Sequence, residues 1–288
     1  MGMGMGLCQT HPRYRHSENG AGNLKTMQKE EITSIFRTHW RTGYGAVSPD
    51  EALYIRDLIL RDRPVDFIEI GTGSGISGGL ICHFLEENGG RRFVTLDHDN
   101  TFFGDPGKEN GFLIEPIYPG GTVTIEKRPF TTALDLDDLG QSFDMAFVDA
   151  NHQHPWPLID TLALWPHMRG DGPRTVIHHD LFLFRKQDIV FGIGPKYLFD
   201  QFPESHREAS PAGGGNIFSV SLSMKREQME EIAANAISLP WSLRTPLQEK
   251  QLKRIFAMID RHYSPDLGRV FREAAAKFNH MDRFRSGL

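Results

Sequence analysis

Two predicted strand ends in the middle of the chain carry acids and histidines that could do chemistry together. Asp149 ends the run FDMAFVD, His152 follows three residues later, and the run RTVIHHD ends in His179 and Asp180. If the two runs are neighbouring parallel strands, these side chains meet at one edge of the sheet. Two carboxylates and a histidine can hold Mg²⁺ or a softer divalent cation. A histidine beside a carboxylate can instead act as a general base.

The residue pattern leaves both assignments open. In the first, Asp149, His179 and Asp180 are metal ligands. In the second, one acid works with His152 or His179 as the general base, and no metal takes part. His179 and Asp180 are adjacent, so on an extended strand their side chains would point to opposite faces, unless the backbone turns where the strand ends. Asp149, His152 and His179 are the candidate catalytic residues in either case, whereas His154 and His167 are expected at the surface.

A glycine-rich stretch, DFIEIGTGSGISGGL at residues 66–80, lies between an apolar run and a helix-like run. Glycines in such a turn let the backbone approach a ligand closely. A dinucleotide-binding G-x-G-x-x-G that begins at Gly71 would need a third glycine at Ile76, and one that begins at Gly73 starts too late in the turn. No Gly-Lys-Ser/Thr follows, which excludes a P-loop.

Strand-like and helix-like segments alternate through most of the chain. The predicted strands span residues 65–70, 92–97, 122–127, 143–149 and 174–180. This alternation predicts an α/β fold, with a doubly wound, mostly parallel sheet covered by helices. Two further strand-like runs, SHREAS and NIFSVSL, flank the segment PAGGG and predict a closing antiparallel hairpin. Ser48 and Glu51 form a capping box for a helix before the first strand.

The two ends of the chain differ from this α/β region. Residues 1–30 are rich in Gly and His without a period, which predicts a flexible leader. Residues 31–223 would form the main domain, and residues 224–288 a helical C-terminal extension. The segments LKRIFAMIDRHY and DLGRVFREAAAKFNHM each have an apolar stripe. We expect these stripes to pack on the main domain, on a second subunit, or on both.

Composition argues against several classes of partner. The 288 residues have a net charge of −5, whereas nucleic-acid binders usually show a basic excess. No apolar run approaches the length of a membrane span, and the N-terminus has no apolar signal-peptide core. The two cysteines, Cys8 and Cys82, define no disulfide framework. We therefore expect a cytoplasmic protein without nucleic-acid or membrane partners.

Taken together, these motifs resemble the class I S-adenosylmethionine-dependent methyltransferases over roughly residues 48 to 222. Those enzymes have an acid followed by G-x-G-x-G, matched here by Glu69, Gly71, Gly73 and Gly75. Their second strand ends in an acid that binds the ribose of the methyl donor, matched here by Asp97. The segment FVDANH resembles the VDG-H element of a bacterial small-molecule methyltransferase family.

The resemblance implies a Rossmann-like enzyme that transfers a methyl group from S-adenosylmethionine to a small-molecule acceptor, at oxygen. The apolar stripes of the C-terminal segments lead us to expect a homo-oligomer. The implied donor-binding residues are Glu69, Gly71, Thr72, Gly73, Gly75, Asp97, His98 and Asp149. Some relatives bind a cation at the two acidic strand ends, which here suggests Mg²⁺ or another divalent ion. Such enzymes have a helix after the second strand, but residues 98–121 are aperiodic and aromatic. This segment is expected to be an ordered lid or an oligomer contact.

Two other functions compete with this one. A nicotinamide-dependent oxidoreductase could use a similar sheet, but the glycine spacing and the lack of a Tyr-x-x-x-Lys pair argue against it. A non-catalytic assembly protein could keep the fold and use its C-terminal helices for oligomers. Binding of S-adenosylmethionine would exclude the oxidoreductase, and turnover would exclude the assembly protein.

Overall fold

The computed structural model describes residues 26–45, 47–170, 172–186, 189–211 and 215–280. Its strands form one seven-stranded sheet in the order β3-β2-β1-β4-β5-β7-β6. Their bounds are β1 Asp66–Ile70, β2 Arg92–Leu96, β3 Thr124–Arg128, β4 Met145–Val148, β5 Thr175–His179, β6 Arg207–Ala209 and β7 Ile217–Ser221. Strands β1 to β5 pair in parallel, and β7 pairs antiparallel with both β5 and β6. The predicted doubly wound sheet and its closing hairpin are confirmed.

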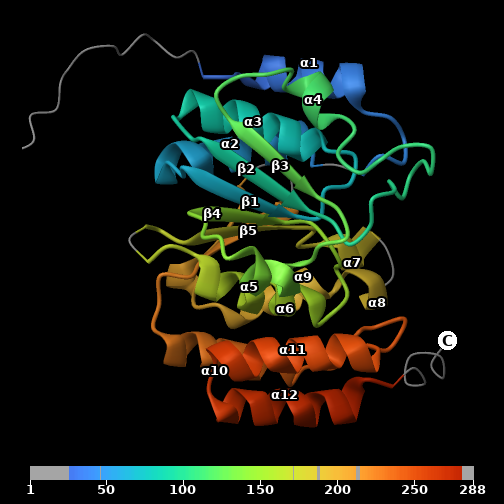
Figure 1. Ribbon diagram of the computed structural model, residues 1–288, viewed down its shortest axis with the longest axis vertical. Coiled ribbons are helices and arrows are strands. Elements are labelled where there is room, and N and C mark those ends of the chain that lie inside the picture. The colour runs from blue at the N-terminus through green and yellow to red at the C-terminus, as the bar shows by residue number, and fades with distance from the viewer. Residues whose placement is uncertain (1–25, 46, 171, 187–188, 212–214, 281–288) are drawn as a thin grey trace, which may run out of the picture.

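Different helices cover the two faces of the sheet (Figure 1). One face packs against α1 (Lys29–His39), α2 (Pro49–Asp62), α3 (Ile76–Glu87) and α4 (Ile114–Ile117). The other packs against α6 (Trp156–Leu164) and α9 (Gly194–Gln201), with the short α5 (Leu136–Leu139) beside them. The short α7 (Leu183–Lys186) and α8 (Ile189–Gly192) follow β5. Because side chains alternate along a strand, Phe67 of β1 lies in the first core and Ile68 in the second.

Three C-terminal helices form an outer layer next to α6 (Figure 1): α10 (Arg226–Ile237), α11 (Glu249–His262) and α12 (Pro265–Phe278). Met229, Ile259 and Phe271 from these helices are buried in the same core cluster as Val176 of β5. The hydroxyl of Tyr263 also donates a hydrogen bond to the carbonyl oxygen of Leu162 in α6, at 2.6 Å. One hydrophobic core therefore runs from the sheet into the C-terminal helices, and the division at residue 223 remains a prediction.

The segment after β2 is ordered and packs against the glycine turn. Phe102 and Tyr118 are buried, and the amide of Gly111 donates to the carbonyl oxygen of Gly73 at 2.9 Å. The only helix in residues 98–121 is the one-turn α4, which explains the absence of a helical period.

Two predictions fall wholly or partly outside the described residues. The first is the flexibility of the leader, because residues 1–25 are not described. The second is the PAGGG turn, of which residues 212–214 are not described. Helix α1 begins at Lys29, inside the segment expected to be leader. Among the residues that are described, no helix is long and apolar enough to cross a membrane.

Candidate active site

The acids and histidines predicted at the ends of β4 and β5 lie together. In the parallel pairing of these strands, Val148 lies opposite His178, so Asp149 and His179 reach the same edge of the sheet. Asp180 has a φ of 62°, a left-handed conformation that a non-glycine residue adopts at a cost of roughly 1–2 kcal/mol. The chain thus leaves its extended path immediately after β5, and the side chains of His179 and Asp180 can both face Asp149.

Distances between side-chain atoms confirm this convergence. Oδ1 of Asp149 lies 3.2 Å from Nε2 of His152 and 3.3 Å from Nδ1 of His179. The same nitrogen of His152 lies 3.2 Å from Oδ2 of Asp180. One potential ligand atom from each of Asp149, His179 and Asp180 lies within 4.8 Å of the others. The structure thus brings together all four residues, in a geometry that a metal site or an acid–base site could use.

Two further polar residues belong to this cluster and were not predicted there. Oε2 of Glu51 lies 3.3 Å from Nε2 of His179, while Glu51 also completes the predicted capping box of α2. The side-chain amide of Asn216 donates to Oδ1 of Asp180 at 2.6 Å. Asn216 precedes β7, whose Ile217 pairs with His179, so the predicted hairpin could have pointed to it. The position of Glu51 depends on how α2 packs, for which the sequence has no local signal.

The cluster has more carboxylates than imidazoles, so negative charge prevails in it. Burial opposes the charged form of His179, but Asp149, Glu51 and Asp180 outweigh it and raise the pKa of His179 well above its usual value. Burial likewise opposes the charged form of Asp149, yet His179 and His152 hold the pKa of Asp149 below its usual range. Three carboxylates face two imidazoles here, so the cluster stays negative even if both rings are protonated. A negative, oxygen-rich cluster is suited to a cation.

Other atoms of the protein pack closely against two of the three glycines in the turn, Gly71 and Gly75, but not against Gly73. Gly71 has a φ of 95°, and a Cβ there would lie 2.2 Å from the carbonyl oxygen of Asp149. A Cβ on Gly75 would lie 2.6 Å from the Ile114 side chain. Gly73 differs, because the nearest atom to its Cβ position is 3.8 Å away, in Phe103. Internal packing therefore accounts for Gly71 and Gly75, and Gly73 is where a ligand can approach the turn.

Asp97 lies beside this turn, at the end of β2. Its Oδ2 accepts hydrogen bonds from the amides of Thr72 at 3.0 Å and Gly73 at 3.4 Å. Asp97 also faces a hollow of about 230 Å³, whose lining is Thr72, Asp97, Asp99, Asn100, Glu109, Asn110, Lys127, Arg128 and Pro129. The neighbouring His98 is 83% exposed, with Nδ1 3.2 Å from Oδ1 of Asp97. Asp97 can thus order the turn and still present a carboxylate to a ligand.

Glu69 is placed differently from what the resemblance implies. Its side chain is fully buried and accepts hydrogen bonds from Ser77 at 2.6 Å and Thr95 at 2.7 Å. Burial raises the pKa of Glu69 to about 8. Glu69 therefore supports the turn from beneath, and its side chain does not reach the hollow beside Asp97.

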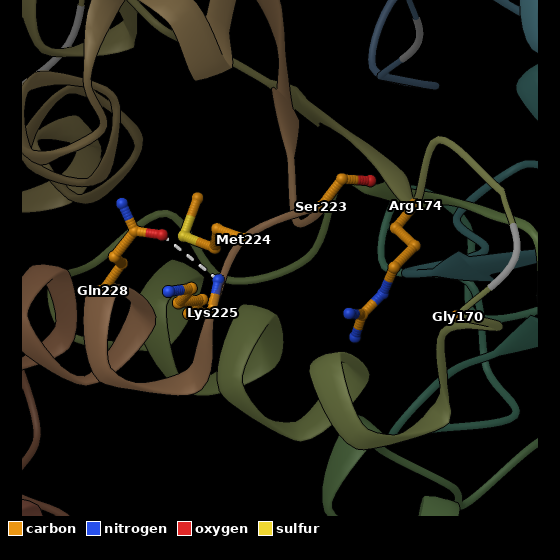
Figure 2. A pocket seen from close by; sticks show the side chains of 6 residues that line it. All are labelled: Gly170, Arg174, Ser223, Met224, Lys225 and Gln228. Carbon is orange, nitrogen blue, oxygen red and sulfur yellow. Dashed lines mark hydrogen bonds between the residues drawn. The ribbon is translucent and has the colours of Figure 1, made fainter.

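A larger hollow, of about 420 Å³, lies elsewhere (Figure 2). Its lining is Gly170, Arg174, Ser223, Met224, Lys225 and Gln228. Arg174 precedes β5 and Ser223 follows the antiparallel β7, so this hollow lies at the amino end of β5. Ligands of doubly wound sheets bind beyond the carboxyl ends of the strands. The cluster at Asp149 and the hollow at Asp97 are therefore the better candidates.

Part of the chain is similar to known proteins. Residues 68–181, which are less than half of the chain, match a family described as a methyltransferase domain. No curated protein matches the chain. Among solved structures, the O-methyltransferase from Bacillus cereus in complex with SAH is 17% identical, over 67% of this chain and 90% of that one, with a TM-score of 0.44. TomG from Streptomyces achromogenes, an O-methyltransferase in complex with SAM, is 18% identical, over 67% of this chain and 88% of that one, with a TM-score of 0.42.

The segment that matches the family, residues 68–181, contains the glycine turn, Asp97 and Asp149. Residues 68–181 are thus similar to a methyltransferase domain.

Proposed function

We propose that this protein transfers a methyl group from S-adenosylmethionine to an oxygen of a small-molecule acceptor, with a divalent cation held by Asp149, His179 and Asp180. The observation that supports the proposal best is the convergence of these side chains beside the glycine turn. The family match of residues 68–181 supports methyl transfer.

The donor site is proposed to lie between Gly73 and Asp97. Bound S-adenosylmethionine supplies a methyl group already activated by its sulfonium, so the protein has mainly to align the acceptor and handle its proton. Asp97 has the carboxylate that a ribose diol requires, and Gly73 leaves the turn open to a ligand. The hollow of about 230 Å³ is smaller than the roughly 300–1,000 Å³ of typical ligand pockets. Residues 99–110, which form one wall, would have to move outward to admit a whole donor.

The cation site would have two carboxylates and one imidazole. A cation held there would lower the pKa of an acceptor hydroxyl. His179 must lose its proton to become a ligand, so metal affinity should fall as the pH falls. Nε2 of His152 lies 3.2 Å from an oxygen of each acid and would donate to them, so a general base at His152 would take up a proton at Nδ1. If no metal takes part, His152 is the proposed general base, because Asp149, Glu51 and Asp180 favour the protonated form of His179.

Chelation separates the two mechanisms. With a cation in the mechanism, EDTA should abolish turnover, and Mg²⁺ or Mn²⁺ should restore it. Binding of S-adenosylmethionine, measured by calorimetry, should change little because Asp97 and Gly73 lie outside the cation cluster. Transfer of a radiolabelled methyl group across a panel of hydroxylated acceptors gives the turnover. Full activity of the metal-free protein would contradict the metal mechanism and favour His152 as the base.

Replacing Asp97 tests the donor site. Asp97→Ala should weaken binding of S-adenosylmethionine by roughly 1–3 kcal/mol, because charge-assisted hydrogen bonds to the ribose are lost. Asp97→Asn is the matched control, since it removes the charge and keeps an oxygen that can accept from the Thr72 amide. It should fall between wild type and Asp97→Ala in titration calorimetry. Wild-type affinity in Asp97→Ala would show that the donor binds elsewhere.

A further inference from the structure

A second cluster of histidine and carboxylate side chains lies far from the candidate active site. Asp137 is in α5, which leads toward β4. His167 ends the 3₁₀ turn Trp165–His167, which leads toward β5, and His262 is the last residue of α11. The cluster therefore lies toward the amino ends of these strands, whereas Asp149 and His179 lie at the carboxyl ends. It joins the outer helical layer to the segments that enter the sheet.

Both imidazoles point to the same carboxylate oxygen. Oδ1 of Asp137 lies 3.1 Å from Nε2 of His167 and 2.7 Å from Nε2 of His262. The two rings are 6.0 Å apart between centroids, at an interplanar angle of 73°. All three potential ligand atoms lie within 4.8 Å of one another. Side-chain exposure is 14% for His167, 20% for His262 and 21% for Asp137, which leaves one side of the cluster open to solvent.

We propose that Asp137, His167 and His262 bind a Zn²⁺-type cation that fastens α11 to the methyltransferase domain. Two imidazole nitrogens and one carboxylate oxygen are a ligand set that suits borderline metals such as Zn²⁺ better than Mg²⁺ or Ca²⁺. Zinc bonds of 2.0–2.1 Å place tetrahedral ligand atoms about 3.3 Å apart. The observed 3.1 and 2.7 Å therefore need only a small outward movement, and water can take the fourth position on the open side.

Neighbouring contacts hold these ligands in place. Nη1 of Arg261 lies 3.2 Å from Oδ2 of Asp137, so the guanidinium engages the oxygen that the imidazoles do not. Such contacts to a ligating carboxylate orient it toward a metal. Earlier in α11, Arg254 pairs with Asp135 at 2.5 Å. The residue after His262 is Tyr263, whose ring stacks on Trp165 with centroids 5.7 Å apart. The three ligands thus come from elements already docked to one another.

Titration of the full chain with Zn²⁺ alone tests the site, after removal of metal with a chelator. By calorimetry, wild type should bind one more equivalent of Zn²⁺ than His262→Gln, which keeps a polar side chain but removes the imidazole ligand. In thermal melts, Zn²⁺ at about 100 times its Kd should raise the Tm of wild type by about 5 °C more than that of the variant. Zinc bound at Asp149 or elsewhere contributes equally to both proteins and cancels in the difference.

Arg254→Ala is the matched control, because it weakens the same junction without removing a ligand. It should melt lower than wild type in the chelator yet keep the full zinc stoichiometry and the full zinc-dependent rise in Tm. If His262→Gln does not fold, His167→Gln replaces it, with the same expected loss of one equivalent. Equal zinc stoichiometry and equal Tm rises in wild type and in the folded histidine variant would overturn the proposal. The contacts already present would then hold α11 at this junction without a metal.

Discussion

A chain that ends at Leu222 is expected to fail to fold. Helix α10 packs on both α6 and α9, and α11 packs on α6. Truncation would expose the apolar faces that these contacts cover, and would remove Met229, Ile259 and Phe271 from the shared core. Each large apolar side chain returned to water costs roughly 1.5–3 kcal/mol. Several such losses equal the roughly 5–15 kcal/mol by which a domain is stable.

The measurement compares soluble yield, near-UV circular dichroism and thermal melting of residues 1–222 with those of the full chain. Two point variants in the C-terminal helices compare the loss of stability at a buried position with that at an exposed position. Phe271→Ala, at a fully buried position, should cost about 3–5 kcal/mol. Lys253→Ala, whose side chain is 73% exposed on α11, should change stability by less than about 0.5 kcal/mol. A soluble, monomeric and equally stable 1–222 protein would show that the helices are dispensable. Size-exclusion chromatography of the full chain also tests the predicted homo-oligomer.

Much of this fold could be predicted because its signals are local. Buried parallel strands are short apolar runs, so β1 and β4 stand out in the sequence, and the stripes of α11 and α12 identify them as helices. Residues 98–121 lack a local period because long-range contacts order them. One such contact is the hydrogen bond from the Leu113 amide to the carbonyl oxygen of Ser74. Packing of this kind depends on the whole chain and leaves no periodic pattern.

The same distinction applies to the candidate sites. Asp149 and Asp180 could be predicted to converge because neighbouring parallel strands bring their carboxyl ends together. The cluster at Asp137 could not, because His262 is 125 residues away along the chain and meets Asp137 only when α11 docks. The expectation that His154 and His167 lie at the surface was wrong for His154, which is 1% exposed, and His167 is largely covered.

Gly71→Ala is expected to damage both stability and turnover severely. The new Cβ would lie 2.2 Å from the carbonyl oxygen of Asp149 and 2.7 Å from its carbon, and backbone atoms cannot move aside as a flexible side chain can. The φ of 95° adds strain, because residues with a side chain rarely adopt such a backbone conformation. We expect a loss of about 3–5 kcal/mol in the free energy of unfolding, at the upper end for single substitutions. Relief of the clash must displace Asp149, and a shift of about 1 Å in a positioned group can lower a rate about 100-fold.

Gly73→Ala, two residues away in the same turn, is the matched control. Gly73 also has a positive φ, of 51°, but its Cβ position has no neighbour closer than 3.8 Å. This variant should therefore lose only about 1 kcal/mol of stability, the cost of the left-handed conformation, and Asp149 should stay in place. Its defect should appear instead in calorimetric binding of S-adenosylmethionine, because the added methyl group narrows the open side of the turn.

Denaturant unfolding and methyl-transfer rates, measured on both variants, distinguish the role of Gly71 from that of Gly73. If Gly71→Ala unfolds and turns over like wild type, the close contact between the turn and the end of β4 does not position Asp149. If instead both variants lose only donor affinity, both glycines face the donor and internal packing does not account for Gly71.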